Sequence, residues 1–328
     1  MEPSAPAVPA PHPAIFVSIA AYRDPQLVPT IHDCLAAARH PERLRFCICW
    51  QRGEDERLPG WVSGRQFNVI EVPFQESRGV CWARSVIMDL WDCEEWYLQL
   101  DSHHRFAPDW DVRLLQHASA VGGPRTVLSA FPPAFTLAGN RSSTPLLTAH
   151  DRFDEDGIPL PAGILFPQWR PGLPPRRTRY LSAAFLFAPG SFVEDVPYDP
   201  ELYFHGEETM LTVRAFTAGY DLYQPCDILL WHEYTRAYRR KHWEDHVPGS
   251  TVDLPWYERD ALSRARIRQL LAERRPSRHG LGNRRSLADY ERYAGISFQT
   301  RRIQEYTRRH QEPPNPPCAR DWAEAESD

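Results

Sequence analysis

The sequence lacks the features that would place it in a membrane or on nucleic acid. Its 328 residues contain no apolar run of about 18 residues, the length that a helix needs to cross a bilayer. The segment 1–13 has no basic region followed by an apolar core, so we do not expect a signal peptide. The formal net charge is −5, which provides no basic field to attract nucleic acid. We therefore expect no membrane and no nucleic-acid partner.

Cysteine is scarce and is not arranged in pairs. The seven cysteines are an odd number and are spread through apolar segments, which argues against a disulfide framework. Cys47 and Cys49 flank one residue of a strand-like run, but a structural zinc site would need a second, matching pair. Buried, reduced thiols and a cytoplasmic location fit this pattern best.

The sequence does contain enough apolar residues for one sizeable core, since 42% are hydrophobic and 12% aromatic. We expect a flexible leader rich in Pro and Ala over 1–13, a catalytic domain over 14–250 and a helical extension over 251–310. The stretch 311–328 contains PPNPP and an acidic end, so we expect a disordered tail there. One catalytic domain with a C-terminal elaboration accounts for the length.

Strand-like and helix-like segments alternate in the first half of the chain. The predicted order is strand Ile15–Tyr22, helix Gln26–Ala38, strand Leu44–Gln51, strand Asn68–Val72, helix Val80–Trp91 and strand Trp96–Asp101. This alternation is typical of an α/β domain with a mainly parallel sheet flanked by helices. Open sheets of this kind bind ligands at the carboxyl ends of their strands. Polar residues that follow the strands are therefore the candidates for a site.

The second half continues with two strands and then becomes helical. We predict strands over 126–131 and 179–187, a helix from Gly206 to Ala218, and further helices over 256–273 and 285–293. Gly219 is a plausible end for the helix that begins at Gly206. The helix over 256–273 is rich in Arg, and a solvated helix face is the simplest explanation for such a run, ahead of phosphate or acceptor binding.

The strongest chemical signal is the triplet Asp101, Ser102 and His103 at the end of a hydrophobic strand. Asp101 and His103 are separated by one residue at a bend, so their side chains can converge on one divalent ion. A carboxylate with an imidazole suits Mn²⁺. Alone, such a pair is better explained by a turn cap and an exposed histidine, and the surrounding sequence reverses this order. His232 follows another apolar strand-like run and can supply a third ligand.

Two further groups have both a structural and a functional explanation. Gly206 opens a helix whose first turn carries Glu207 and Glu208, and acidic residues there are stabilised by the helix dipole. Alternatively, one of them reaches a substrate. Arg84 precedes the strand that ends at Asp101, so it can pair with Asp101 or with a diphosphate, or be an ordinary surface residue.

Three other histidines receive no metal role. His104 projects away from His103 in an extended segment, so we expect it at the surface or in support of the ligands. His242 and His246 have helical spacing, but no carboxylate motif accompanies them.

Four motifs carry a family resemblance. In sequence order they are RGVCWAR, WYLQLDSHHRF, YFHGEETMLTVRAFTAGYDL and PCDILLWHEY. This ordered set resembles the cytosolic UDP-GlcNAc:hydroxyproline polypeptide N-acetylglucosaminyltransferases and, more distantly, the polypeptide N-acetylgalactosaminyltransferases. The later LGNRRSLADYERYAGISF is similar to a C-terminal signature of the first family. The resemblance extends from Ile15 to Phe298.

The resemblance implies a GT-A fold, a UDP-GlcNAc donor, a divalent cation such as Mn²⁺ and retention of anomeric configuration. It assigns Asp101, His103 and His232 to the metal, Glu207, Asp101 and Arg84 to catalysis, and Tyr22, Arg23, Asp24, Arg84, Ser102 and Gly206 to the donor. In retaining enzymes of this kind the departing diphosphate is thought to help deprotonate the acceptor. Glu207 is therefore expected to position the sugar or to act electrostatically rather than as a base.

Several functions remain open at this stage. The expected reaction is transfer of N-acetylglucosamine from UDP-GlcNAc to a hydroxyl group, with hydroxyproline of a protein as one acceptor. The same donor chemistry on a small molecule or a glycan is an alternative, because the loop 142–168 can shape a different acceptor site. A sugar-nucleotide-binding module without turnover and a metal hydrolase that uses Asp101, His103 and His232 are the remaining alternatives.

Overall fold

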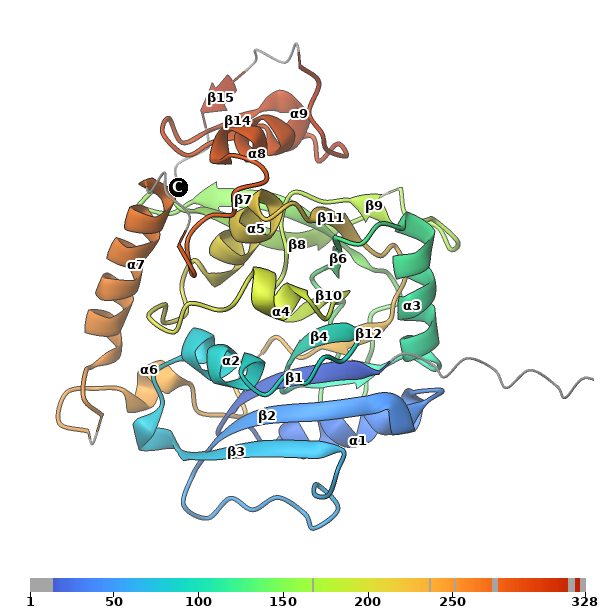
Figure 1. Cartoon of the computed structure of the whole chain (residues 1–328), viewed down its shortest axis with the longest axis vertical. Helices are drawn as coiled ribbons and strands as arrows, with labels where there is room; N and C mark the ends of the chain where they lie inside the picture. Colours follow the sequence, from blue (N-terminus) through green and yellow to red (C-terminus); the bar gives the residue numbers. More distant parts are fainter. Residues whose placement is uncertain are drawn as a thin grey trace, which may run out of the picture.

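The structure is built on an eight-stranded mixed sheet with the strand order β3-β2-β1-β4-β10-β6-β11-β9 (Figure 1). It is a computed structural model that describes residues 14–166, 168–235, 237–250, 252–272, 277–317 and 322–324. The predicted leader over 1–13 and residues 318–321 and 325–328 of the predicted tail lie outside these residues. The strands β1 to β4 run parallel, whereas β10 is antiparallel to both of its neighbours, β4 and β6.

The strands of the main sheet are β1 (Ile15–Tyr22), β2 (Leu44–Arg52), β3 (Phe67–Pro73), β4 (Trp96–Asp101), β6 (Thr126–Ser129), β9 (Arg176–Arg177), β10 (Phe185–Pro189) and β11 (Asp221–Gln224). Three smaller sheets pair β5 (His104–Phe106) with β12 (Leu230–His232), β7 (Leu146–Phe153) with β8 (Pro159–Leu165), and β13 (Ile296–Ser297) with β14 (Arg302–Gln304) and β15 (Trp322–Glu324). The β5–β12 pair matters most here, because it brings a distant part of the chain to the end of β4.

The helices are α1 (Leu27–Ala37), α2 (Val80–Met88), α3 (Trp110–Val121), α4 (Phe192–Asp195), α5 (Glu207–Thr217), α6 (His242–Asp245), α7 (Trp256–Ala272), α8 (Leu287–Ala294) and α9 (Glu305–Arg308). Figure 1 shows α1 and α2 on opposite faces of β1 to β3. The helices α8 and α9 lie at the top of the view, at the end of the molecule opposite β3. Within the described part of the chain, no helix has both the length and the apolar character to span a membrane.

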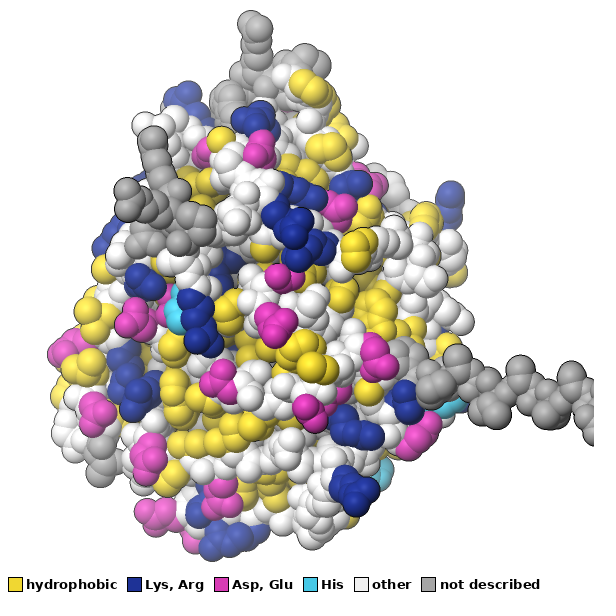
Figure 2. All heavy atoms as spheres, in the orientation of Figure 1, with side chains coloured by type: hydrophobic (Ala, Val, Ile, Leu, Met, Phe, Trp, Pro, Cys, Tyr) yellow, Lys and Arg dark blue, Asp and Glu magenta, His cyan; other side chains and the backbone are white. Residues whose placement is uncertain are grey.

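The core follows from the alternation of side chains along the strands. In β1, Phe16 packs with apolar residues of α2 and α5, whereas Ile15, Val17 and Ile19 pack with α1 and α3 on the other face. Successive strand residues point to opposite faces, so a strand that is apolar throughout must be covered on both sides. The α/β fold with a central sheet flanked by helices is therefore confirmed. Charged side chains of both signs are scattered over the face that Figure 2 shows.

The prediction of a strand over 179–187 is wrong for residues 179–184. Only Phe185–Pro189 forms the strand β10, and the preceding residues form a loop beside the end of β4. The backbone N–H groups in this loop bind side chains instead of a neighbouring strand: Leu181 donates to Thr212 Oγ1, and Ser182 donates to Ser129 Oγ. These side chains come from α5 and β6, so the local sequence of the loop gives no sign of them.

The Arg-rich helix α7 does more than present a solvated face. Arg264 Nη1 lies 3.0 Å from Asp154 Oδ2 and 3.1 Å from Asp156 Oδ2, both in the turn between β7 and β8. His205 Nε2 contacts the same Asp154 oxygen at 2.6 Å. Because His205 directly precedes the helix α5, these contacts connect α7 and the β7–β8 turn to the start of α5.

The segment after α9 differs from the prediction of disorder as far as residue 317. Asn315 is buried, and its amide group donates to Gln304 Oε1 and Thr307 Oγ1. Arg179, which is also buried, binds Asn315 Oδ1 at 2.6 Å and the carbonyl oxygens of Ala294 and Gln311. One guanidinium thus joins this segment and α8 to the main sheet. The extension also contains strands β13 and β14 beside its predicted helices.

Replacing Arg179 by Ala should lower the free energy of unfolding by about 3 kcal/mol, because three charge-assisted hydrogen bonds are lost and the buried Asn315 Oδ1 loses its donor. Urea denaturation measures this loss, and limited proteolysis should show faster cleavage near residues 311–317. Arg177→Ala is the matched control, since Arg177 is only half-buried and lies over the ring of Tyr223. Equal stability of the two variants would contradict the role given to Arg179.

Candidate active site

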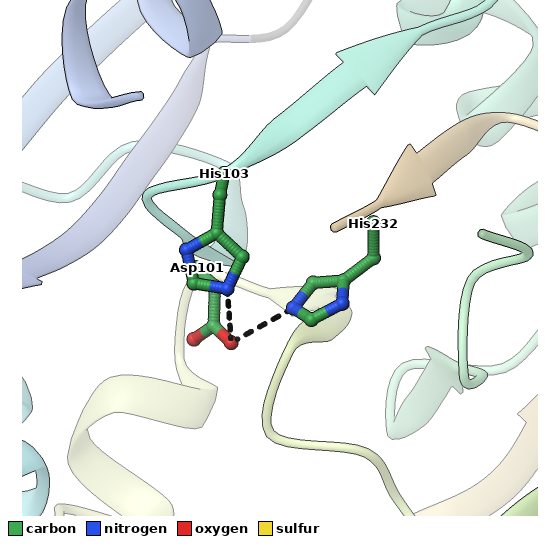
Figure 3. A group of neighbouring side chains, drawn as sticks. All are labelled: Asp101, His103 and His232. Atoms are coloured by element: carbon green, nitrogen blue, oxygen red, sulfur yellow. Dashed lines mark hydrogen bonds and ion pairs between the residues drawn. The ribbon is translucent and has the colours of Figure 1, made fainter. Parts of the chain in front are cut away.

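Three potential metal ligands converge beyond the end of β4. Asp101 is the last residue of β4, His103 follows it, and His232 ends β12, whose pairing with β5 sets it opposite His104. Their ligand atoms all lie within 4.8 Å of one another. Figure 3 shows both imidazole rings turned toward the Asp101 carboxylate, with Oδ2 lying 3.2 Å from His232 Nε2 and 3.8 Å from His103 Nε2.

The donor set fits a divalent cation. Adjacent ligands of an octahedral ion with bonds of 2.0–2.1 Å lie about 3 Å apart, and the separations of the Asp101 carboxylate from the two imidazoles, 3.2 and 3.8 Å, are close to this spacing. His103 Nδ1 faces Asp24 Oδ2 at 2.8 Å, and a ring that donates there keeps a lone pair on Nε2, on the side of Asp101. One carboxylate oxygen and two imidazole nitrogens suit Mn²⁺ among other divalent ions.

Arg84 joins this ligand set to the start of α5. The buried guanidinium places Nη2 2.8 Å from Asp101 Oδ1 and Nε 2.9 Å from Glu207 Oε1. Burial disfavours the charge of Asp101, but the hydrogen bond with His232 and the charge of Arg84 outweigh it and lower the pKa of Asp101 well below its usual range. Burial raises the pKa of Glu207, and Arg84 offsets this only in part. Arg84 is thus not a surface residue, and the predicted pairing with Asp101 is present.

Gly206 provides the backbone conformation that begins α5. Its φ of 79° lies in the left-handed region, and a Cβ atom there would lie 2.5 Å from Ile267 Cδ1 of α7. Glu207 is the first residue of the helix, as predicted. Its side chain points inward to Arg84, whereas Glu208 accepts a hydrogen bond from the Ala183 N–H at 3.0 Å.

One cavity lies over the carboxyl ends of β1, β2 and β4. It is lined by Ala20, Tyr22, Gln51, Ser77, Gly79, Val80, Asp101, Ser102, His103, Phe204, Arg239, Lys241, His242 and Trp243. We call it the strand-end cavity. The segment 239–243 lies on its outer side and contributes two cationic side chains, Arg239 and Lys241.

A second cavity, of about 460 Å³, lies beside the first and shares Asp101 with it. Its lining residues include Arg84, Asp101, Phe131, Asp151, Arg152, Leu160, Pro161, Ala184, Glu207, Glu208, His232 and Tyr234. We call it the hairpin cavity, because the β7–β8 hairpin forms one wall. The two cavities meet at the proposed metal ligands, so a molecule bound in one can react with a molecule bound in the other.

Only some of the residues predicted to bind the nucleotide line the strand-end cavity. Tyr22 and Ser102 line the strand-end cavity, and the Tyr22 hydroxyl donates to Asp245 at 2.9 Å. Arg23 also binds Asp245 and lies over the ring of Phe74, outside the lining. Asp24 is buried behind His103. Nucleotide contact therefore remains a prediction for all of these residues.

Sequence reasoning missed several residues that line the strand-end cavity. Gln51 ends a predicted strand, so its position could have indicated a place in the site. Ser77 does not directly follow a predicted strand and reaches the cavity only through the fold. The run of basic residues that includes Arg239 and Lys241 follows His232 in the sequence and was another usable signal. His242, which received no role, also lines this cavity.

His104 is buried rather than at the surface, so that part of its prediction is wrong. Its ring nitrogens face the carbonyl oxygens of Trp231 and Ala184, each at 3.0 Å. The reason is the pairing of β5 with β12, a contact between residues more than one hundred positions apart. His104 thereby supports the backbone next to His232.

The fold is of the GT-A type. The crystal structure of GalNAc-T7 with UDP, GalNAc and Mn²⁺ aligns with a TM-score of 0.56 and 17% identity, over 72% of this chain and 45% of that chain. The chain thus matches less than half the length of GalNAc-T7. Staphylococcus aureus TarS aligns with a TM-score of 0.46 and 12% identity, over 68% and 37% of the two chains. Comparison with curated protein sequences gave no match.

The chain belongs to the glycosyltransferase (GlcNAc) family, whose family model matches residues 14–63 and 61–300. This match spans most of the chain and includes every residue that we assigned to the metal, to catalysis or to the donor. Membership of this family agrees with the GT-A-type fold.

We expect the free energy of unfolding of the metal-free protein to depend on pH through Glu208, which lines the hairpin cavity. Burial raises the pKa of Glu208 from 4.5 to about 8, so the folded protein keeps a proton that the unfolded chain loses at lower pH. Through this group, the free energy of unfolding decreases as the pH rises from 4.5 to 8. Glu208→Gln cannot ionise and should therefore lose less stability than the wild type between about pH 5.5 and pH 8.

Urea denaturation at both pH values, in the presence of a chelator, measures this difference. Glu201→Gln is the control, since the Glu201 side chain is 71% exposed. If Glu208→Gln and Glu201→Gln follow the same pH dependence, the raised pKa of Glu208 is refuted.

Proposed function

We propose that this chain transfers N-acetylglucosamine from UDP-GlcNAc to a hydroxyl acceptor with retention of configuration and with Mn²⁺ or another divalent cation. The convergence of Asp101, His103 and His232 between two adjoining cavities is the observation that carries the proposal. The family description names GlcNAc, and the similar GalNAc-T7 was crystallised with UDP, a sugar and Mn²⁺, which supports the choice of donor and ion.

In this proposal the strand-end cavity binds the nucleotide. Tyr22 and Gln51 lie where a base and ribose would enter, and Arg239 and Lys241 provide positive charge for a diphosphate. A divalent cation held by Asp101, His103 and His232 would neutralise charge on the UDP that leaves. In the transfer itself, the bond from the sugar to the diphosphate breaks, a bond from the sugar to the acceptor oxygen forms, and the acceptor proton passes to the departing UDP.

Glu207 is proposed to orient the sugar rather than to attack it. Its carboxylate is paired with Arg84 at 2.9 Å, and an oxygen in such an ion pair is a weak nucleophile. The same pair keeps Glu207 at the boundary of the hairpin cavity, where a sugar hydroxyl can donate to it. Arg84 is proposed to hold both carboxylates in place.

The acceptor is proposed to enter through the hairpin cavity. Phe131 and Tyr234 supply aromatic surface there, and Asp151 and Arg152 supply polar groups. Hydroxyproline of a protein is the acceptor implied by the resemblance, and a glycan or a small molecule is the second candidate. A module that binds the donor without turnover is the non-enzymatic alternative.

We also propose that the protein acts in the cytoplasm. The cysteines in the described part of the chain, Cys34, Cys47, Cys49, Cys81, Cys93 and Cys226, are free thiols. Free thiols are typical of reducing compartments, which supports this location.

A donor screen tests the proposed function. Incubation with a panel of UDP- and GDP-sugars, with and without Mn²⁺, should release UDP from UDP-GlcNAc only when the ion is present, and mass spectrometry identifies the products. Asp101→Asn should weaken Mn²⁺-dependent UDP binding at least about tenfold, since even outer partners of metal ligands contribute this much. Asp109→Asn is the control, because that side chain is 53% exposed and lines neither of the two cavities.

Three outcomes would count against the proposal. If nucleotide were released only from a GDP-sugar, UDP-GlcNAc would not be the donor. No hydrolysis or transfer under any condition would favour the binding module. Activity on phosphate esters without a nucleotide sugar would favour the metal hydrolase.

Glu207→Gln keeps the size of the side chain but removes its charge and weakens the contact with Arg84. We expect kcat for transfer to fall at least about 100-fold, the scale for losing one preorganised polar contact, while donor affinity changes little. Steady-state kinetics and isothermal titration calorimetry separate the two quantities. Glu155→Gln, at an 85% exposed side chain, should behave as the wild type. If Glu207→Gln had the kcat of the wild type, the proposed catalytic role of Glu207 would be wrong.

A further inference from the structure

A buried carboxylate, Asp24, lies on the far side of His103 from the metal ligands. It follows Arg23, whose φ of 45° turns the chain sharply at the end of β1 and directs Asp24 back beneath the β4 end. Its Oδ2 atom accepts a hydrogen bond from Ser102 Oγ at 2.7 Å and lies 2.8 Å from His103 Nδ1. Arg239 Nε lies 3.4 Å from the same oxygen and balances its charge.

The orientation of Asp24 is itself fixed. Its Oδ1 atom accepts a hydrogen bond from the Gln26 N–H at 2.8 Å, at the beginning of α1. Both oxygens are therefore occupied, and rotation of the carboxylate would break contacts on both sides. This is a more constrained arrangement than a single contact between a carboxylate and a histidine.

A second residue of the same helix holds the backbone of the bend. Thr30 is fully buried, and its hydroxyl donates to the Ser102 carbonyl at 2.9 Å. The hydroxyl oxygen of Thr30 accepts a hydrogen bond from the His104 N–H at 2.9 Å. Asp24 thus contacts the side chains of the bend, and Thr30 contacts the peptide groups on either side of His103.

We infer that Asp24 and Thr30 are positioning residues that together set the ring tautomer and the orientation of His103 as a metal ligand. This inference rests on the proposed function only for the presence of the metal. Asp24 fixes the proton on Nδ1, which leaves the Nε2 lone pair directed to the side where Asp101 and His232 lie. Thr30 keeps the backbone from rotating the ring out of that direction. Asp24 consequently acts through His103 rather than on the nucleotide.

The test is the affinity of the full-length protein for Mn²⁺ alone, measured by isothermal titration calorimetry without nucleotide. Asp24→Asn should bind Mn²⁺ about 10–100-fold more weakly than the wild type, the range for outer partners of metal ligands. Thr30→Val retains the shape of Thr30 and should also weaken Mn²⁺ binding. Asp111→Asn is the matched control: Asp111 is another buried carboxylate, but it binds the N–H groups of Arg39 and His40 at the other end of α1.

The outcomes separate this inference from the proposed function. If the wild type binds no divalent ion, the metal-dependent function and this inference both fail. If the wild type binds Mn²⁺ and both Asp24→Asn and Thr30→Val bind it equally well, only the inference fails. An equal loss in Asp111→Asn would also overturn it, because the effect would then be general to buried carboxylates.

A measurement on the wild type avoids any folding defect of the variants. Nitrogen-15 NMR of the metal-free protein, with the His103 signals assigned by comparison with His103→Gln, reports which ring nitrogen carries the proton. We expect a proton on Nδ1 and a lone pair on Nε2. The opposite tautomer would refute the role of Asp24.

Discussion

The arrangement of the site depends on one buried cation, Arg84. Its guanidinium lies 2.8 Å from Asp101 on one side and 2.9 Å from Glu207 on the other. Two carboxylates so close together in a buried place would otherwise suppress each other's ionisation, and an unpaired buried charge is strongly destabilising. Because Asp101 ends β4 and Glu207 begins α5, the same guanidinium links the proposed metal site to the residue proposed to orient the sugar.

The charges around Arg84 also explain why the site suits a cation. When ionised, Asp101 and Glu207 together carry one negative charge more than Arg84 balances, and His103 and His232 add neutral nitrogen donors. A divalent ion would reverse this deficit and create local positive charge, which is what a diphosphate requires. On the proposed function, the negative charge of the ligand set therefore favours the ion, and the bound ion in turn favours the donor.

The sequence was sufficient for the parts of the molecule that depend on local pattern. Apolar runs bounded by turn residues predicted β1, β2 and β4, and the polar residues after them predicted the converging ligands. The rest depends on contacts between distant segments. The predicted strand over 179–187 failed because Thr212 and Ser129, from other elements, bind its backbone. Likewise, Asp24 lies behind the proposed metal ligands and follows Arg23 in a left-handed conformation, which no periodicity reveals.

The two cavities are built from different parts of the chain, and this division has a consequence for specificity. The ends of β1, β2 and β4 and the segment 239–243 line the strand-end cavity, to which the β7–β8 hairpin contributes no residue. The hairpin instead lines the second cavity with Asp151, Arg152, Leu160 and Pro161. On the proposed function, changes in the hairpin can therefore alter the acceptor without disturbing the nucleotide. Asp101 belongs to both walls, so the two specificities meet at the residue that Arg84 holds in place.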